Sequence, residues 1–151
     1  MEKRATEFYN ILVPVSSNDT GEQAIRLACG LAKKGKSKIC AVYVVTVSRA
    51  LPVEAEIQSE IEKGEDILDY AEGVGEEQGW EIETDVLQAR EVAPAIVDEA
   101  AERGADLILM GTTPKTRFGR FTVGNVVPYV LKNAPCRVIL YQYASPPAEL
   151  L

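Results

Sequence analysis

The chain has 151 residues, enough for one domain with a sizeable core and no need of a metal or disulfide staple. Hydrophobic residues make up 46% and charged residues 26% of it, a composition typical of globular rather than disordered proteins. The sequence contains no histidine, which excludes Ser-His and Cys-His nucleophile pairs, H-E-x-x-H metal sites and imidazole acid-base catalysis. We therefore expect no catalytic residue and no metal site.

The net charge is −7, and the acidic residues are concentrated in one part of the chain. Between Glu54 and Glu83 there are twelve acidic residues and a single basic one, Lys63. A surface of this kind repels a phosphate backbone, so nucleic acid is not expected as a partner. The carboxylates also lack the spacing of a calcium loop, and we expect them to form a solvated face.

The N-terminal residues and the cysteines favour a cytoplasmic protein. No apolar signal segment follows the mixed charges of the first seven residues, and the longest apolar run, Ile39 to Val45, is too short to span a bilayer. Cys29, Cys40 and Cys136 are odd in number and widely separated, which favours buried thiols over disulfides or zinc ligands. We expect a cytoplasmic location and no membrane insertion.

The first part of the chain predicts a strand, a helix and a second strand. Asn10 to Val15 is a short apolar run, and the polar residues Ser16 to Thr20 that follow it are expected to cap a helix. Apolar residues keep helical spacing from Ala24 to Leu31, two lysines would occupy the last turn, and Gly35 is expected to end the helix. Ile39 to Val45 is apolar without alternation, as in a strand covered on both faces of a parallel sheet.

The middle of the chain predicts a long crossover, a strand, a helix and another strand. Apolar residues keep helical spacing from Val53 to Ala71, and Trp80 to Val86 alternates like a half-exposed strand near a sheet edge. Ala93 to Arg103 predicts a helix that stops at Gly104, and Asp106 to Met110 predicts the fourth strand.

The last part of the chain predicts a long connection, a short helix and a fifth strand. Gly111 to Gly124 is a fourteen-residue connection, and Asn125 can cap the helix that follows. Three apolar residues of that helix are expected to face inward: Val127, Val130 and Leu131. Arg137 to Tyr143 predicts the fifth strand, so we expect one domain over residues 1–143 and a flexible tail over residues 144–151.

This alternation of strands and helices predicts an α/β fold with a single doubly wound, five-stranded parallel sheet and helices on both faces. In such sheets, ligands bind beyond the carboxyl ends of the strands, where the winding direction reverses. The pattern therefore points to the loops at that edge. Asp106 would lie at the opposite end of its strand, and we assign it no role.

The connection after the fourth strand is a local positive patch in an acidic chain. Between Gly111 and Asn125 it contains Lys115, Arg117 and Arg120 and no acidic residue. Its glycines allow close approach of the backbone, and the amides of Asn125 and Val126 would carry the positive end of a helix dipole. These are the parts of an anion site. The same residues also suit a long turn with solvated cations, and residue types alone leave both interpretations open.

Four pieces of the chain resemble the universal stress protein family: Ile11 to Val15, Ala105 to Gly111, Gly124, and Asn133 to Val138. The similarity extends through almost the whole chain. It implies the strand order 3-2-1-4-5 and a homodimer that pairs through the last strand, in the region of Val138 and Leu140. In one branch of the family it also implies ATP binding in a cleft between strands one and four.

The phosphate loop of that ATP-binding branch reads glycine, two residues, glycine, nine residues, glycine, and then serine or threonine. Gly111 and Gly124 match the first and third glycines, whereas Pro114 and Asn125 replace the second glycine and the hydroxyl residue. Proline has no amide N–H, so one backbone contact to phosphate would differ. Ser16 stands where relatives often carry an aspartate that contacts the nucleoside.

The resemblance and the charge pattern together give the candidate residues for binding ATP or another adenine nucleotide: Val15, Ser16, Val44, Gly111, Thr112, Lys115, Arg117, Arg120, Gly124, Asn125 and Val126. Three functions are compatible with them. The first is a nucleotide-responsive regulator, and the second is a nucleotide-independent dimeric module similar to the stress-protein domains of some membrane transporters. The third is a weak nucleotide hydrolase, for which no general base is evident.

Overall fold

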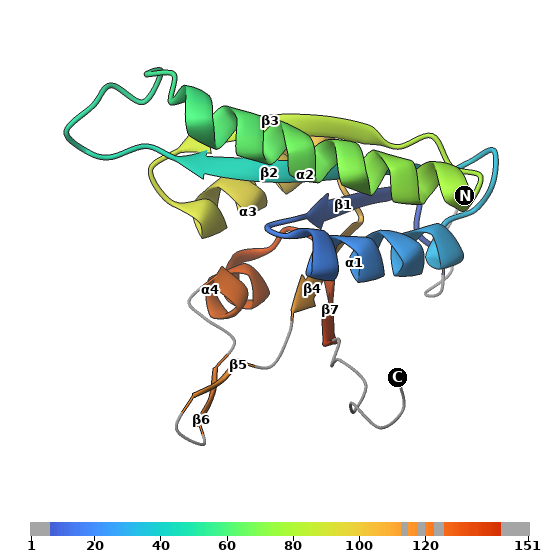
Figure 1. Ribbon diagram of the computed structural model, residues 1–151. Coiled ribbons are helices and arrows are strands. Elements are labelled where there is room, and N and C mark those ends of the chain that lie inside the picture. Colours follow the sequence, from blue (N-terminus) through green and yellow to red (C-terminus); the bar gives the residue numbers. More distant parts are fainter. Residues whose placement is uncertain (1–6, 113–114, 118–119, 123–125, 143–151) are drawn as a thin grey trace.

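In the computed structural model of the chain, a parallel sheet lies between two pairs of helices (Figure 1). The structure describes residues 7–112, 115–117, 120–122 and 126–142. The strands of the sheet are β1 (Asn10–Pro14), β2 (Lys38–Thr46), β3 (Glu83–Ala89), β4 (Leu107–Thr112) and β7 (Arg137–Gln142). The helices are α1 (Asn18–Leu31), α2 (Gln58–Glu77), α3 (Val92–Arg103) and α4 (Val126–Asn133).

The strand order is β3-β2-β1-β4-β7 with every pair parallel, which confirms the predicted order 3-2-1-4-5 and the doubly wound architecture. The register places Leu12 of β1 between Cys40 of β2 and Ile108 of β4. The strand β1 is central. The chain goes on from it to β2 and β3 on one side of the sheet, and then returns to place β4 and β7 on the other side. The winding therefore reverses between β1 and β4.

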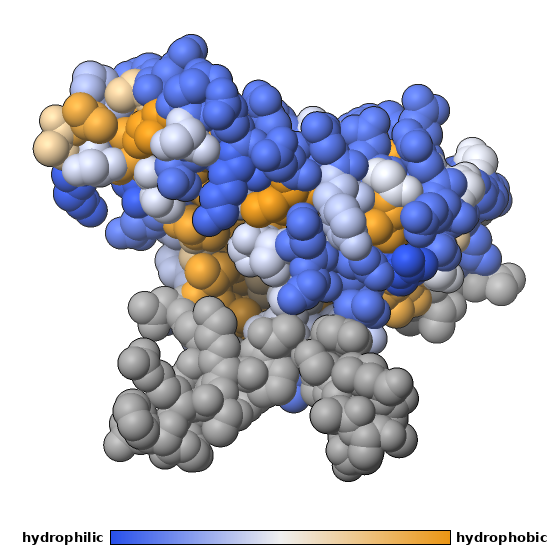
Figure 2. Space-filling view, viewed as in Figure 1, coloured by the Kyte–Doolittle hydropathy of each residue, from blue (hydrophilic) through white to orange (hydrophobic). Residues whose placement is uncertain are grey.

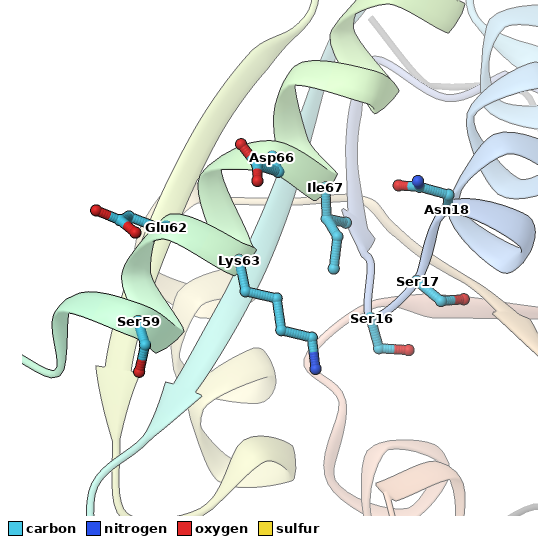
Figure 3. Close-up of a pocket in the computed structure, with 8 residues that line it drawn as sticks. All are labelled: Ser16, Ser17, Asn18, Ser59, Glu62, Lys63, Asp66 and Ile67. Carbon is cyan, nitrogen blue, oxygen red and sulfur yellow. The ribbon is translucent and has the colours of Figure 1, made fainter.

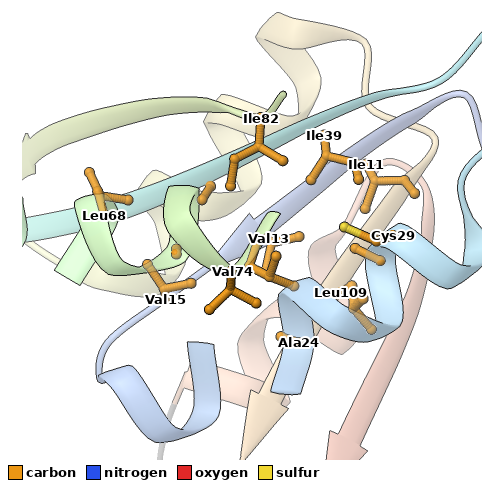
Figure 4. Close-up of a cluster of buried hydrophobic side chains, with 14 of the residues drawn as sticks. Ile11, Val13, Val15, Ala24, Cys29, Ile39, Leu68, Val74, Ile82 and Leu109 are labelled. Carbon is orange, nitrogen blue, oxygen red and sulfur yellow. The ribbon is translucent and has the colours of Figure 1, made fainter. Parts of the chain in front are cut away.

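Alternate residues of each strand enter one of two cores. Ile11 and Val13 belong to the core beneath α1 and α2, which Figure 4 shows, whereas Leu12 faces the core beneath α3 and α4. Each such side chain is almost fully buried and contributes about 1.5–3 kcal/mol of hydrophobic free energy. Continuous apolar strands are needed because both faces of this sheet are covered.

The first helix begins as predicted and ends earlier than predicted. Ser17 is its N-cap, and its side-chain oxygen accepts a hydrogen bond from the backbone N–H of Thr20 at 3.4 Å. The helix ends at Leu31 with Ala32 in an extended conformation, so the prediction of a C-cap at Gly35 is wrong. Ala32 leaves the helix because it forms a parallel bridge with Phe8, just before β1.

The crossover and the third strand are both shifted from their predicted positions. The helix α2 begins at Gln58, so Val53 lies in the preceding connection, where its carbonyl accepts a hydrogen bond from Gln88. The strand β3 begins at Glu83, later than predicted, because the buried Ile82 packs into the core beside α2 before the pairing with β2 starts.

The fourteen-residue connection after the fourth strand contains regular structure that the sequence pattern did not predict. The strand β4 continues to Thr112, and β5 (Lys115–Arg117) pairs with β6 (Arg120–Thr122) as an antiparallel hairpin (Figure 1). In α4, Val127 and Val130 are buried as predicted. Leu131 is 56% exposed, so the prediction that it faces inward is wrong.

Two further features of the described residues bear on the predictions. Cys29 and Cys40 are buried free thiols, as predicted, and Cys136 is half-buried. Burial raises the pKa of Cys40 to about 11, so this thiol is neutral at pH 7. Within the described part of the chain, no helix combines the length and the apolar character needed to cross a membrane.

Candidate functional site

A cavity of about 750 Å³ lies at the carboxyl ends of β1, β2 and β4, where the winding of the sheet reverses. Its walls come from the three strands, from the loop between β1 and α1, and from the first turns of α2, α3 and α4. This is the position at which doubly wound sheets bind ligands. The volume lies within the range of pockets for small molecules.

One wall of the cavity is apolar. Val44 of β2 and Met110 of β4 contribute side chains from the sheet, and Ile96 and Val127 contribute them from α3 and α4. Val44 is half-buried, so it borders the cavity rather than serving only as a core residue. An apolar wall of this kind suits a flat, weakly polar group such as a nucleobase.

Hydroxyl groups from the loop after β1 also line the cavity. Ser16 is exposed at the cavity, whereas Ser17 and Thr20 are half-buried and their hydroxyl oxygens lie 2.8 Å apart. Ser17 and Thr20 are held by the N-cap of α1, as predicted for a capping role. Ser16 is therefore the hydroxyl of this loop that stays available to a ligand.

Gly111 borders the cavity, and close packing against α1 explains why this residue is a glycine. A Cβ atom added at Gly111 would lie 2.6 Å from the carbonyl oxygen of Thr20 and 3.3 Å from Cβ of Ala24. The first turn of α1 therefore packs directly onto the backbone of β4. A glycine is required there whether or not a phosphate group approaches.

A second hollow of about 600 Å³ adjoins the cavity between α2 and the start of α1, and Figure 3 shows its lining. It shares Ser16, Ser17 and Lys63 with the cavity. The other residues of its lining are mostly polar: Asn18, Ser59, Glu62, Asp66 and Ile67. The cavity therefore has an apolar interior and a polar extension.

The structure brings part of the predicted site together around this cavity. Six of the candidate residues line it: Val15, Ser16, Val44, Gly111, Thr112 and Val126. Lys115, Arg117 and Arg120 lie on the hairpin of β5 and β6, of which the structure describes the backbone. Gly124 and Asn125, as well as Pro114, lie outside the described residues.

Sequence reasoning missed the contribution of α2 to this site. Glu60 and Lys63 line the cavity, although both belong to the segment that was interpreted as a solvated acidic face. Figure 2 shows that hydrophilic side chains do cover much of that helix. The one available signal was Lys63, the single basic residue among twelve acidic ones between Glu54 and Glu83.

Asp106, to which we assigned no role from its position in the predicted strand, is a structural residue. Its carboxylate accepts hydrogen bonds from the backbone N–H groups of Tyr9 at 2.8 Å and Asn10 at 3.0 Å. These contacts join the amino ends of β1 and β4, at the edge of the sheet opposite the cavity. Asp106 therefore stabilises the central strand pair and has no place in the candidate site.

Comparison with known proteins gives a family match over almost the whole described chain. The model of the universal stress protein family matches residues 7–142. A universal stress protein of Methanocaldococcus jannaschii is 37% identical in an alignment of 141 residues that covers 88% of this chain and 81% of that protein.

Solved structures show the same fold. The universal stress protein of Archaeoglobus fulgidus superposes with a TM-score of 0.74 at 24% identity, covering 87% of this chain and 97% of the other. A structure of the Archaeoglobus fulgidus protein in complex with dAMP gives a TM-score of 0.69 at 25% identity, with coverage of 87% and 96%.

Proposed function

This chain belongs to the universal stress protein family, and from that premise we propose that its cavity binds an adenine nucleotide such as ATP. The observation that carries the proposal is the cavity itself, which lies at the switch point between β1 and β4 and is lined by both apolar side chains and hydroxyl groups. A similar protein, from Archaeoglobus fulgidus, has a structure in complex with dAMP.

The lining suggests how the nucleotide lies. The base packs against the apolar wall near Val44 and Met110, and the sugar approaches Ser16. The phosphates extend toward Gly111 and the amide of Val126 at the start of α4, where the helix dipole favours negative charge. The cations predicted for this region, Lys115, Arg117 and Arg120, would add to that attraction.

We assign the chain a regulatory role in the cytoplasm, in which nucleotide occupancy alters a homodimer. The sequence contains no histidine, and binding rather than hydrolysis is the proposed activity. The homodimer would form through β7, which is an edge strand of the sheet.

Thermal unfolding with and without nucleotide tests the proposal. At a concentration of 100 times Kd, AMP, dAMP or ATP should stabilise the protein by about 2.7 kcal/mol and raise Tm by roughly 5–10 °C. The variants Gly124→Val and Val44→Trp should abolish the rise, because the first obstructs the expected phosphate loop and the second fills the apolar wall. Gly30→Ala is the matched control, since a Cβ at Gly30 meets nothing within 4 Å.

Acid extraction of freshly purified protein, followed by chromatography, gives an independent test through the small molecules that co-purify. If no adenine compound is released and no adenine nucleotide raises Tm, the nucleotide-binding proposal is wrong.

A nucleotide-independent dimeric module is the second candidate function, and one observation favours it. Apolar side chains are exposed on the helix α4 and on the edge strand β7: Tyr129, Leu131 and Leu140. Such a surface suits a protein contact whether or not a nucleotide binds.

A further inference from the structure

Lys63 is the single basic residue in the acidic segment from Glu54 to Glu83, and its place in the structure suggests a function for it. It lies on α2 and lines both the main cavity and the adjoining polar hollow. Within the helix, Glu60 and Asp66 lie three residues before and after it, the spacing at which lysine and carboxylate side chains ordinarily pair.

The lysine does not pair with those carboxylates. Among the residues that the structure describes, Lys63 forms no ion pair, whereas four other basic side chains do. Figure 3 shows its side chain extending from α2 across the hollow toward Ser16, while the carboxylates of Glu62 and Asp66 point away from its ammonium group. The ammonium group thus faces the opening between α2 and the loop after β1.

The chemistry of this opening favours an anionic group. Lys63 offers three N–H donors and a positive charge, and Ser16 offers a hydroxyl group on the facing side. A phosphate group placed between them would accept charge-assisted hydrogen bonds, which are stronger than those between neutral partners. The carboxylates of Glu60 and Glu62 make the surrounding surface negative, so Lys63 supplies the positive charge that an anion needs on the α2 side.

We propose that Lys63 is an anion-binding residue of the cavity and holds a phosphate group of the bound nucleotide from the side of α2. This inference rests on the proposed nucleotide function and adds a contact from a helix that supplies none of the predicted site residues. It also gives the cavity a cation that is independent of the hairpin at residues 115–122.

Calorimetric titration of the full chain with AMP and with adenosine tests the proposal, because the two ligands differ only in the phosphate. Lys63→Gln should weaken AMP binding about tenfold and leave adenosine binding unchanged, because the lysine makes a solvent-screened, charge-assisted hydrogen bond to the phosphate alone. Lys63→Glu should weaken AMP binding further, and Lys63→Arg should retain most of it.

Lys36→Gln is the matched control. Lys36 is exposed in the turn before β2, at the amino ends of the strands, whereas the cavity lies at their carboxyl ends. Its replacement should change neither the affinity for AMP nor that for adenosine. Because Lys63 is exposed, its variants should unfold at the same urea concentration as the wild type, which a urea titration checks.

The outcomes separate this inference from the function on which it rests. If wild type binds AMP and Lys63→Gln binds it equally well, Lys63 has no anion contact, although the nucleotide function stands. Equal losses for AMP and adenosine would likewise overturn the inference, because the lysine would then shape the cavity rather than contact phosphate. If wild type binds neither ligand, the nucleotide function and this inference both fail.

Discussion

Gly64 is unfavourable for the helix in which it lies, but it is required by the contact of that helix with the sheet. Glycine in the middle of a helix costs about 0.5–1 kcal/mol relative to alanine, and the sequence pattern marks Gly64 only as a weak point of the crossover helix. In the structure, a Cβ atom at this position would lie 2.5 Å from Cδ1 of the buried Tyr43. The glycine therefore lets α2 lie against the ring of a β2 residue.

Gly64→Ala and Gly73→Ala form a matched pair of variants in α2. Gly64→Ala should lower the free energy of unfolding by about 1–3 kcal/mol, because it overpacks the contact with Tyr43. Gly73→Ala should raise it by about 0.5–1 kcal/mol, because a Cβ there meets nothing within 4 Å and alanine favours the helix. Urea unfolding of both variants measures the difference, and equal stabilities would show that the ring of Tyr43 moves aside.

At the scale of elements, the candidate site depends on how closely α1 approaches β4. The first turn of α1 lies so near the backbone of Gly111 that no side chain fits between them. The resemblance assigned Gly111 to phosphate binding, and the packing of α1 is a second and sufficient reason for the same residue. A loss of ligand binding in a Gly111 variant would therefore not by itself identify a phosphate contact.

Gly111→Ala should displace the start of α1 and lower the free energy of unfolding by roughly 2–4 kcal/mol, because the contact is with backbone and cannot be relieved by a rotamer change. Gly30→Ala, near the other end of α1, should be neutral or slightly stabilising. Urea unfolding gives the stabilities, and amide hydrogen exchange in residues 18–31 locates the change. Unaltered exchange in α1 of the Gly111 variant would contradict the packing argument.

At the scale of the whole molecule, the open question is what covers the edge at β7. The sheet has two edge strands, β3 and β7, and an exposed edge invites pairing with another chain. Leu140 on the edge strand β7 is 37% exposed, and Tyr129 and Leu131 of α4, the helix that precedes β7 in the chain, are exposed as well. This arrangement favours the proposed homodimer through β7.

Leu140→Glu should convert a homodimer into a monomer, because it places a charge in an apolar interface. Leu51→Glu is the matched control: Leu51 is 43% exposed in the connection between β2 and α2, where Figure 2 shows a hydrophobic area. Light scattering after size-exclusion chromatography gives the mass of each variant. A wild-type monomer, or a Leu140→Glu dimer as stable as the wild type, would rule out this interface.

Patterns within the sequence were enough to predict the class of fold and the five strands of the main sheet. The runs from Asn10 and from Ile39 are apolar without alternation, and only a sheet covered on both faces buries every residue of such a run. The cap at Ser17 and the stop at Gly104, which has a φ of +66°, are also local signals that the structure confirms. The strand order followed from the resemblance, because periodicity carries no information about which strands are neighbours.

The features that depend on contacts between distant segments of the chain could be seen only in the folded structure. The end of α1 at Leu31 depends on a bridge to Phe8, and the glycine at position 111 depends on the approach of Thr20. Lys63 lines the cavity because α2 packs beside α1 on the same face of the sheet, which no pattern within residues 54–83 reveals. Local spacing predicts which face of a helix is apolar, but the residue that its polar side meets is set by the packing of the whole chain.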